Sequence, residues 1–170
     1  MELVFLVFII NDYICLKLPF MDHLELKRKL VEECRKQLEK VVNNLKTAMD
    51  EAQQSANEYG LPKDRYDSFR MQQLNKKDMF GQQMKKSLDE LYALEKIDLK
   101  KEMTKAGFGA VVYTTEQKIF ISIGLGKLLL DQETYFAVSV HVPLAIALNG
   151  KQKGDSFDIN GKKIEILDLF

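Results

Sequence analysis

The chain contains 170 residues, a length typical of one ordinary domain or two small ones. It carries 25 Lys and Arg residues and 25 Asp and Glu residues, so its formal net charge is zero. Residues 22–104 carry 17 basic and 16 acidic side chains, and residues 105–170 carry seven of each. This balance gives no argument for free nucleic acid or an anionic membrane as the main partner. We expect any nucleic-acid contact to be local or made through a protein partner.

The cysteines and histidines indicate neither a metal site nor a disulfide scaffold. Cys15 and Cys34 are isolated, and this usage suits a reducing cytoplasm. His23 and His141 are far apart and have no Cys/His cluster around them. The sequence also has no Ser-His-Asp arrangement, no Gly-rich phosphate loop and no His-Glu-x-x-His motif. We therefore expect that the chain is not an enzyme on its own.

Residues 1–20 differ in character from the rest of the chain. The apolar run Leu3–Ile10 is too short to span a membrane, which takes about 20 residues. A secretory signal would need basic residues before this run and small residues after it, and both are missing. We expect residues 1–20 to be an upstream extension and Met21 to be the natural start. The alternative is a weak membrane-associating segment.

Residues 22–99 show the heptad pattern of two long amphipathic helices. In the first arm, apolar residues alternate between spacings of three and four over about four heptads. These residues are Leu24, Val31, Cys34, Leu38, Val41, Leu45, Ala48 and Ala52. The second arm has a looser version of the pattern, interrupted at Asp78 and Gly81. Its residues are Met71, Leu74, Met84, Leu88 and Leu91.

A polar break over residues 58–67 separates the two arms. Gly60 and Pro62 in this break cannot continue a helix. One short break favours an antiparallel hairpin over a continuous rod. We therefore predict an antiparallel coiled-coil hairpin over residues 21–104, with its tip near 58–67 and a reach of about 50 Å.

From residue 105 onward the hydrophobic period changes from seven to two. Strands are predicted over 110–113, 119–123, 135–140, 157–159 and 163–167. The last two flank Asn160-Gly161, a strong hairpin signal. A short apolar helix is predicted over 143–148, where Pro143 opens it and Gly150 follows it. The predicted fold is α+β: the helical hairpin, then a small antiparallel sheet with one short helix over residues 105–170. So small a sheet is expected to pack on the base of the hairpin.

A short motif covers residues 139–155 and consists of Ser139, Pro143, Ala147, Leu148, Gly150, Lys151, Gly154 and Asp155. These residues resemble the C-terminal domain of the GreA/GreB transcript-cleavage factors. That family reads Ser-Pro-x-Ser-Pro, then a small helix ending Ala-Leu-x-Gly-Lys, then x-x-Gly-Asp and a final hairpin. Val140 and Val142 stand where the family has its first proline and second serine.

The resemblance extends over residues 22–170, because the family also places a coiled-coil hairpin before its sheet domain. It implies an FKBP-like fold for residues 105–170. In that family the sheet domain docks at the rim of the secondary channel of bacterial RNA polymerase, and the hairpin enters the channel. The resemblance therefore makes the following motif positions candidate partner-binding residues: Ser139, Pro143, Gly150, Lys151, Gly154 and Asp155.

Acidic residues at the family's hairpin tip help to hold a second Mg²⁺ at the polymerase active site, which promotes cleavage of backtracked RNA. When Tyr66 is matched to the tyrosine of the family tip, the metal-directed positions fall on residues that have no carboxylate. No catalytic residue carries over by motif. Glu58, Asp64 and Asp67 are the substitutes that carboxylate chemistry suggests for a Mg²⁺ shared with the polymerase.

The leading hypothesis is a cytoplasmic Gre-like elongation factor with RNA polymerase as its partner. It would contact nucleic acid only through the polymerase complex and would hold no cofactor tightly, and no membrane partner is expected. In a close variant the protein occupies the channel as an inhibitor without stimulating cleavage. Lys63 and Arg65 favour this variant, because they lie beside the tip carboxylates and oppose cation binding.

Two further classes remain open. The hairpin could be an interaction or oligomerisation module unrelated to transcription. The FKBP-like fold also suggests a prolyl isomerase, although a fold alone does not confer activity. The sequence of the sheet domain shows no aromatic-lined pocket for that reaction.

Overall fold

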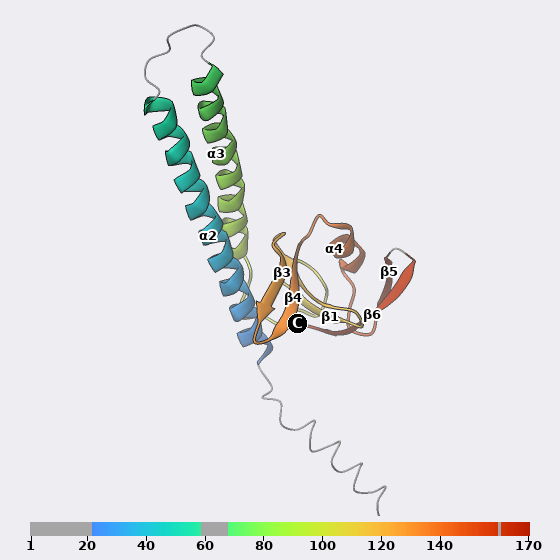
Figure 1. The fold of residues 1–170 in the computed structure, drawn as a ribbon. Coiled ribbons are helices and arrows are strands. Elements are labelled where there is room, and N and C mark those ends of the chain that lie inside the picture. Colours follow the sequence, from blue (N-terminus) through green and yellow to red (C-terminus); the bar gives the residue numbers. More distant parts are fainter. Residues whose placement is uncertain (1–21, 59–67, 160) are drawn as a thin grey trace, which may run out of the picture.

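The computed structural model describes residues 22–58, 68–159 and 161–170. The predicted extension over 1–20 lies outside these ranges, and so do Asp64 and Asp67 in the predicted tip. The described elements are α2 (His23–Glu58), α3 (Ser68–Glu95), β1 (Val111–Thr114), β2 (Lys118–Ser122), β3 (Gly126–Leu130), β4 (Glu133–Ser139), α4 (Pro143–Leu148), β5 (Ser156–Ile159) and β6 (Lys162–Leu169). Within these ranges the predicted fold class is confirmed, with two long helices followed by a mostly antiparallel sheet and one short helix (Figure 1).

Helices α2 and α3 form an antiparallel pair that projects away from the sheet (Figure 1). Lys77 Nζ donates a hydrogen bond of 2.7 Å to Gln53 Oε1. Nearer the sheet, Gly81 lies beside the side chain of Met49. Residue numbers therefore fall along α3 as they rise along α2, as the hairpin prediction requires. Among the described helices, none combines the length and the hydropathy needed to cross a membrane.

The predicted apolar seam of α2 is only partly buried. The predicted positions that are fully buried are Val31, Cys34, Leu38 and Ala52. Val41 is 40% exposed, so the prediction was wrong at that position. Leu26 and Leu30 lie off the predicted pattern but are buried, because they pack in a core that also contains residues of the sheet.

On α3 the predicted seam holds at Leu74, Met84 and Leu91, which are half-buried, and is wrong at Met71 and Leu88. Leu88 is 45% exposed and Met71 is 58% exposed, whereas Ser87 is 8% exposed. Leu94 is anchored in the core at the base of the hairpin, where it is 1% exposed. A step of one heptad back from Leu94 reaches Ser87 rather than Leu88. Ser87 and Leu94 complete this seam beside the predicted Met84 and Leu91, and neither Ser87 nor Leu94 was predicted.

Helix α3 ends at Glu95, before the predicted end near Leu99. The N–H groups of Lys96 and Ile97 bond to the carbonyls three residues earlier, at 3.1 Å each. Such bonds tighten the last turn and close the helix.

The strand order of the sheet is β3-β4-β2-β1-β6-β5. All neighbouring pairs are antiparallel except β2 and β4, which are parallel. Strand β3 was not predicted from the sequence. It forms a hairpin with β4 through Asp131 and Gln132, which both adopt positive φ angles. Helix α4 has the bounds predicted for it.

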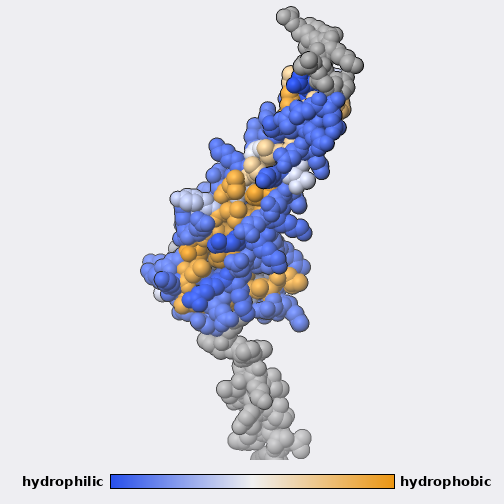
Figure 2. All heavy atoms as spheres, turned by 90° about the vertical axis from the view of Figure 1, so that its left-hand side faces the viewer, coloured by the Kyte–Doolittle hydropathy of each residue, from blue (hydrophilic) through white to orange (hydrophobic). Residues whose placement is uncertain are grey.

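The sheet has a hydrophobic core on each of its faces. One core joins the sheet to the base of the hairpin, as predicted, and its buried residues are Leu26, Leu30, Val31, Cys34, Leu38, Leu94, Ile97, Val111, Phe120, Ile123, Leu128, Tyr135, Ala137 and Phe170. The other core lies under α4, and its buried residues are Ala106, Ala110, Val112, Ile119, Ile121, Ala145, Leu148, Phe157, Ile164 and Ile166. Figure 2 shows a band of hydrophobic side chains that runs from the base of the molecule along the lower part of the hairpin.

Phe170 joins the first core to the start of α2. Its ring stacks on His23 with the ring centroids 4.0 Å apart, and it is 1% exposed. Its backbone N–H and C=O both pair with Val111. His23 Nδ1 lies 3.3 Å from a carboxylate oxygen of Glu102. These contacts hold three parts of the chain together: the start of α2, the segment before β1 and the end of β6.

Candidate functional site

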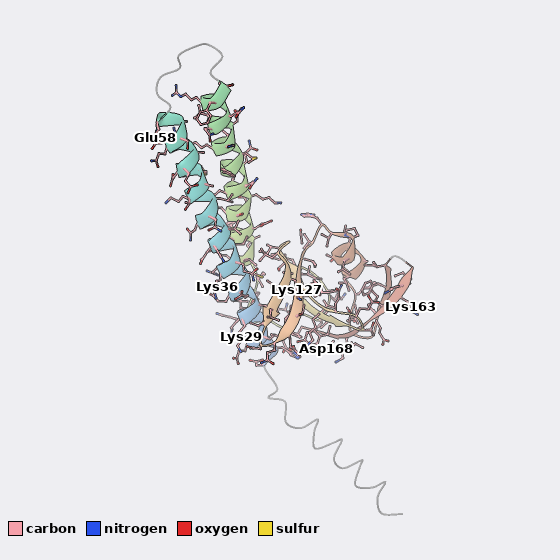
Figure 3. The ribbon with its side chains drawn as sticks, in the orientation of Figure 1. Lys29, Lys36, Glu58, Lys127, Lys163 and Asp168 are labelled. Atoms are coloured by element: carbon pink, nitrogen blue, oxygen red, sulfur yellow. The ribbon has the colours of Figure 1, made fainter. Side chains whose placement is uncertain are left out.

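The far end of α2 carries the one described residue of the three tip carboxylates. Glu58 lies at the end of the hairpin farthest from the sheet (Figure 3), and its side chain is exposed. Its Oε1 accepts a hydrogen bond of 2.6 Å from Gln54 Nε2. Asp64 and Asp67 lie outside the described residues. A carboxylate at this position has the chemistry that Mg²⁺ prefers. Among the described residues, no group of three or more His, Cys, Asp or Glu side chains could hold a metal ion.

Apolar side chains lie next to this tip on α3. Phe69 is 41% exposed and Met71 is 58% exposed in the first turn of the helix. Met71 was predicted to lie in the interior of the hairpin, and its exposure shows that this prediction was wrong.

The first part of the Gre-like motif turns the chain from β4 into α4. Ser139 is the last residue of β4, and its carbonyl accepts a hydrogen bond of 3.2 Å from Val142 N–H. Pro143 is the first residue of α4, and its fixed φ angle suits a helix. Its lack of an N–H group costs nothing there, because N–H groups in the first turn have no partner within the helix. Pro143 is exposed on the surface of this corner.

The second part of the motif ties the end of α4 to the segment before β1. Gly150 adopts φ +77°, and its N–H donates to the carbonyl of Ala106 at 2.8 Å. The N–H of Ala106 donates in return to the carbonyl of Lys151, also at 2.8 Å. A residue with a side chain is strained at such a positive φ, so the glycine has a structural reason at this position.

The third part of the motif builds the turn that leads into β5. Gly154 adopts φ +87°, and its N–H donates to the carbonyl of Ile166 at 2.8 Å. Asp155 Oδ2 accepts a hydrogen bond of 2.8 Å from Gln152 N–H. The structure thus gives Gly150, Gly154 and Asp155 a role in the backbone and leaves Pro143 as an exposed feature of the motif.

A small apolar pocket of about 150 Å³ lies beside this corner. Its exposed apolar side chains are Phe108, Val140 and Ile146, of which Ile146 is 62% exposed. None of the three is among the site residues predicted from the sequence. The sequence feature that could have indicated this pocket is Ile146, an apolar residue on the face of α4 opposite the buried Ala145 and Leu148.

A polar cluster connects β1, β2 and β4 at one edge of the first core. Glu133 Oε2 accepts hydrogen bonds from Lys118 Nζ at 2.5 Å and from Tyr135 OH at 2.8 Å. The hydroxyls of Tyr135 and Tyr113 lie 3.4 Å apart. The hydrogen bond from Lys118, then that from Tyr135, hold the pKa of Glu133 below its ordinary value. Burial raises the pKa of Tyr135, and its hydrogen bonds add to this effect.

No protein-family model matches the chain, and no curated protein gives a significant sequence match. Among solved structures, the matches include two Gfh1 proteins. One is the GreA factor homolog 1 (Gfh1) of Thermus thermophilus, with 15% sequence identity, a TM-score of 0.31, and 80% of this chain and 94% of that chain covered. Another is Gfh1 of Thermus aquaticus, with 19% identity, a TM-score of 0.28, and 81% and 92% covered.

Proposed function

We propose that this chain is a Gre-like factor that binds bacterial RNA polymerase and modulates elongation and the cleavage of backtracked RNA. The observation that carries the proposal is the combination of a long two-helix projection with the Gre-like motif on the sheet domain. At about 1.5 Å per residue, the helical projection has a length on the order of 50 Å. That is long enough to reach from the surface of a large enzyme into its interior.

The two ends of the molecule would have different tasks. The sheet domain would dock at the rim of the secondary channel through the corner at Pro143 and the neighbouring apolar pocket. The hairpin would enter the channel with Glu58 and the sequence around Asp64 and Asp67 leading. Because the polymerase is an intracellular enzyme, the proposal places the protein in the cytoplasm.

The chain would contribute carboxylates rather than a complete active site. Glu58, Asp64 and Asp67 would present oxygen ligands to a Mg²⁺ that the polymerase also holds. A second Mg²⁺ supplies an activated water and stabilises negative charge on the phosphate. The catalytic groups remain those of the polymerase, so the chain is not an enzyme in this proposal.

A second form of the same proposal is favoured by the charge at the tip. Lys63 and Arg65 stand beside the carboxylates in the sequence and oppose the binding of a cation. In this form the hairpin occupies the channel without stimulating cleavage and acts as an inhibitor.

The test is RNA release from a stalled, backtracked polymerase complex with increasing amounts of the protein, using the full chain and a chain that begins at Met21. Variants are Asp64→Ala/Asp67→Ala at the tip and Asp50→Ala/Glu51→Ala on the exposed shaft of α2 as the matched control. If the carboxylates hold Mg²⁺, wild type and shaft control accelerate cleavage, while the tip variant binds without accelerating it.

Other outcomes separate the alternatives. Binding that leaves cleavage unchanged or slower would support the inhibitory form. A chain that does not bind polymerase and self-associates in sedimentation experiments would overturn the proposal in favour of an interaction module.

A further inference from the structure

A pocket of about 430 Å³ lies where the base of the hairpin meets the segment that leads into the sheet. Three stretches line it: α2 through Lys27, residues 96–98 directly after the end of α3, and the segment between residues 101 and 108. Its volume lies in the range of small-molecule sites. The pocket is separate from the tip carboxylates, and it shares Phe108 with the small apolar pocket beside the motif corner.

The lining of this pocket is strongly positive in a chain that is neutral as a whole. It contains four lysines, Lys27, Lys96, Lys101 and Lys105, and one carboxylate, Asp98. Lys96 Nζ lies 4.4 Å from the centroid of the Tyr92 ring. The remaining three lysines come from two different stretches, so the fold itself brings their charges together.

Lys27 is the unusual member of the set, because it is 1% exposed. Its Nζ donates one hydrogen bond, of 3.3 Å, to the carbonyl of Lys101. An ammonium group has three N–H donors, and no carboxylate among the described residues lies within ion-pair distance of it. Burial lowers the pKa of Lys27, an effect that Asp98 opposes. A buried cation without an ion pair is costly, and an anion in the pocket would supply the missing partner.

The pocket also has apolar walls, formed by Ile97, Met103 and Phe108. Phe108 is 37% exposed, so its ring is accessible to a ligand. A phosphate group suits the lysines, and an organic group suits the apolar wall. We propose that this pocket binds a phosphorylated small molecule, with its phosphates on Lys27, Lys101 and Lys105 and its organic part against Phe108. The proposal does not depend on an interaction with RNA polymerase.

The test is calorimetric titration of the full chain with three probes: inorganic phosphate, pyrophosphate and ADP without Mg²⁺. The expected result is one site per chain and tightest binding for ADP. Lys101→Gln/Lys105→Gln should weaken ADP binding by about tenfold or more, since two charge-assisted contacts are lost. The matched control is Lys76→Gln/Lys86→Gln, which removes two exposed lysines from the side of α3 and should leave binding unchanged.

Lys27→Met separates a ligand role from a structural one. Methionine fills a similar volume, and removing an unpaired buried charge is often neutral or stabilising. We expect weaker ADP binding together with a Tm that stays the same or rises. A lower Tm with unchanged ADP binding would overturn the role of Lys27.

Three results would overturn the proposal as a whole: no binding of any probe, equal losses in the two double variants, or hexaglutamate binding in preference to ADP. The last result would assign the pocket to an acidic protein segment. Binding of pyrophosphate without binding of ADP would overturn the contact between Phe108 and an organic group.

Discussion

Glu133 shows how a single partly exposed carboxylate can contribute to the stability of the sheet. It accepts hydrogen bonds from Lys118 and Tyr135, which belong to β2 and β4. Its pKa is lowered in the folded protein. The ionised carboxylate therefore stabilises the folded state above the ordinary pKa of glutamate, and this contribution is lost as the pH falls through the lowered value.

We predict that Glu133→Gln removes part of this acid dependence. At neutral pH the variant should be less stable by about 1 kcal/mol or less, because the side chain is half exposed and screened by water. The difference from wild type should shrink between about pH 5 and pH 3, where the carboxylate becomes protonated. The measurement is urea unfolding at a series of pH values. Asp158→Asn, an exposed change on β5, is the control. If the difference in free energy of unfolding between Glu133→Gln and wild type did not change at low pH, the prediction would be contradicted.

At the scale of the secondary-structure elements, two glycines should respond in opposite ways to an added side chain. Gly81 is helical, and a Cβ placed there would meet Met49 Cε at 3.6 Å, an ordinary contact. Gly109 adopts φ +89°, and a Cβ there would meet Ile97 Cγ2 at 3.1 Å. Glycine weakens a helix interior, whereas only glycine adopts a left-handed conformation without strain.

We predict that Gly81→Ala stabilises the protein by about 1 kcal/mol and that Gly109→Ala destabilises it by at least about 1 kcal/mol. Thermal unfolding followed by circular dichroism at 222 nm measures both effects in one experiment. Equal effects of the same sign in the two variants would show that the conformations assigned to the glycines are wrong.

The elements also show what the sequence could and could not predict. The bounds of α4 were predictable, because Pro143 and Gly150 have conformational properties that mark its ends. Strand β3 was not, because its turn places Asp131 and Gln132 at positive φ angles without the Asn-Gly or Asp-Gly signal. On α3 the half-buried Met84 and Leu91 were predictable from the heptad pattern, whereas the buried Ser87 was not, because a serine gives no apolar signal.

The candidate sites divide in the same way. The motif over residues 139–155 was visible because its members are close in sequence. The lysine pocket was not, because Lys27 is separated from Lys101 and Lys105 by the whole hairpin. The metal role of Glu58, Asp64 and Asp67 stays a prediction.

At the scale of the whole molecule, the hairpin base and one face of the sheet share a single core. Leu30 is 0% exposed in this core, together with Leu94 from α3 and Phe120 from β2. The hairpin alone would leave these residues exposed, and so would the sheet alone. Loss of packing at this point should therefore affect both parts at once.

We predict that Leu30→Ala lowers the stability by about 2 to 5 kcal/mol, the usual cost of a cavity in a core. Helix content measured at 222 nm and the near-ultraviolet tyrosine signal should decrease in one coincident transition, for both wild type and variant. Val41→Ala, an exposed change on the same helix, is the control and should have a much smaller effect. Two separate transitions in wild type would contradict a shared core.

The position of Phe170 in that core has a consequence for synthesis of the protein on the ribosome. The helices precede the sheet in the chain, and about 130 residues separate Leu38 from Phe170, so translation between them takes on the order of 10 seconds. During that interval α2 and α3 can pair locally, but the apolar side chains at their base have no cover. The nascent chain therefore exposes a hydrophobic surface to chaperones until Phe170 has left the ribosome and can stack on His23.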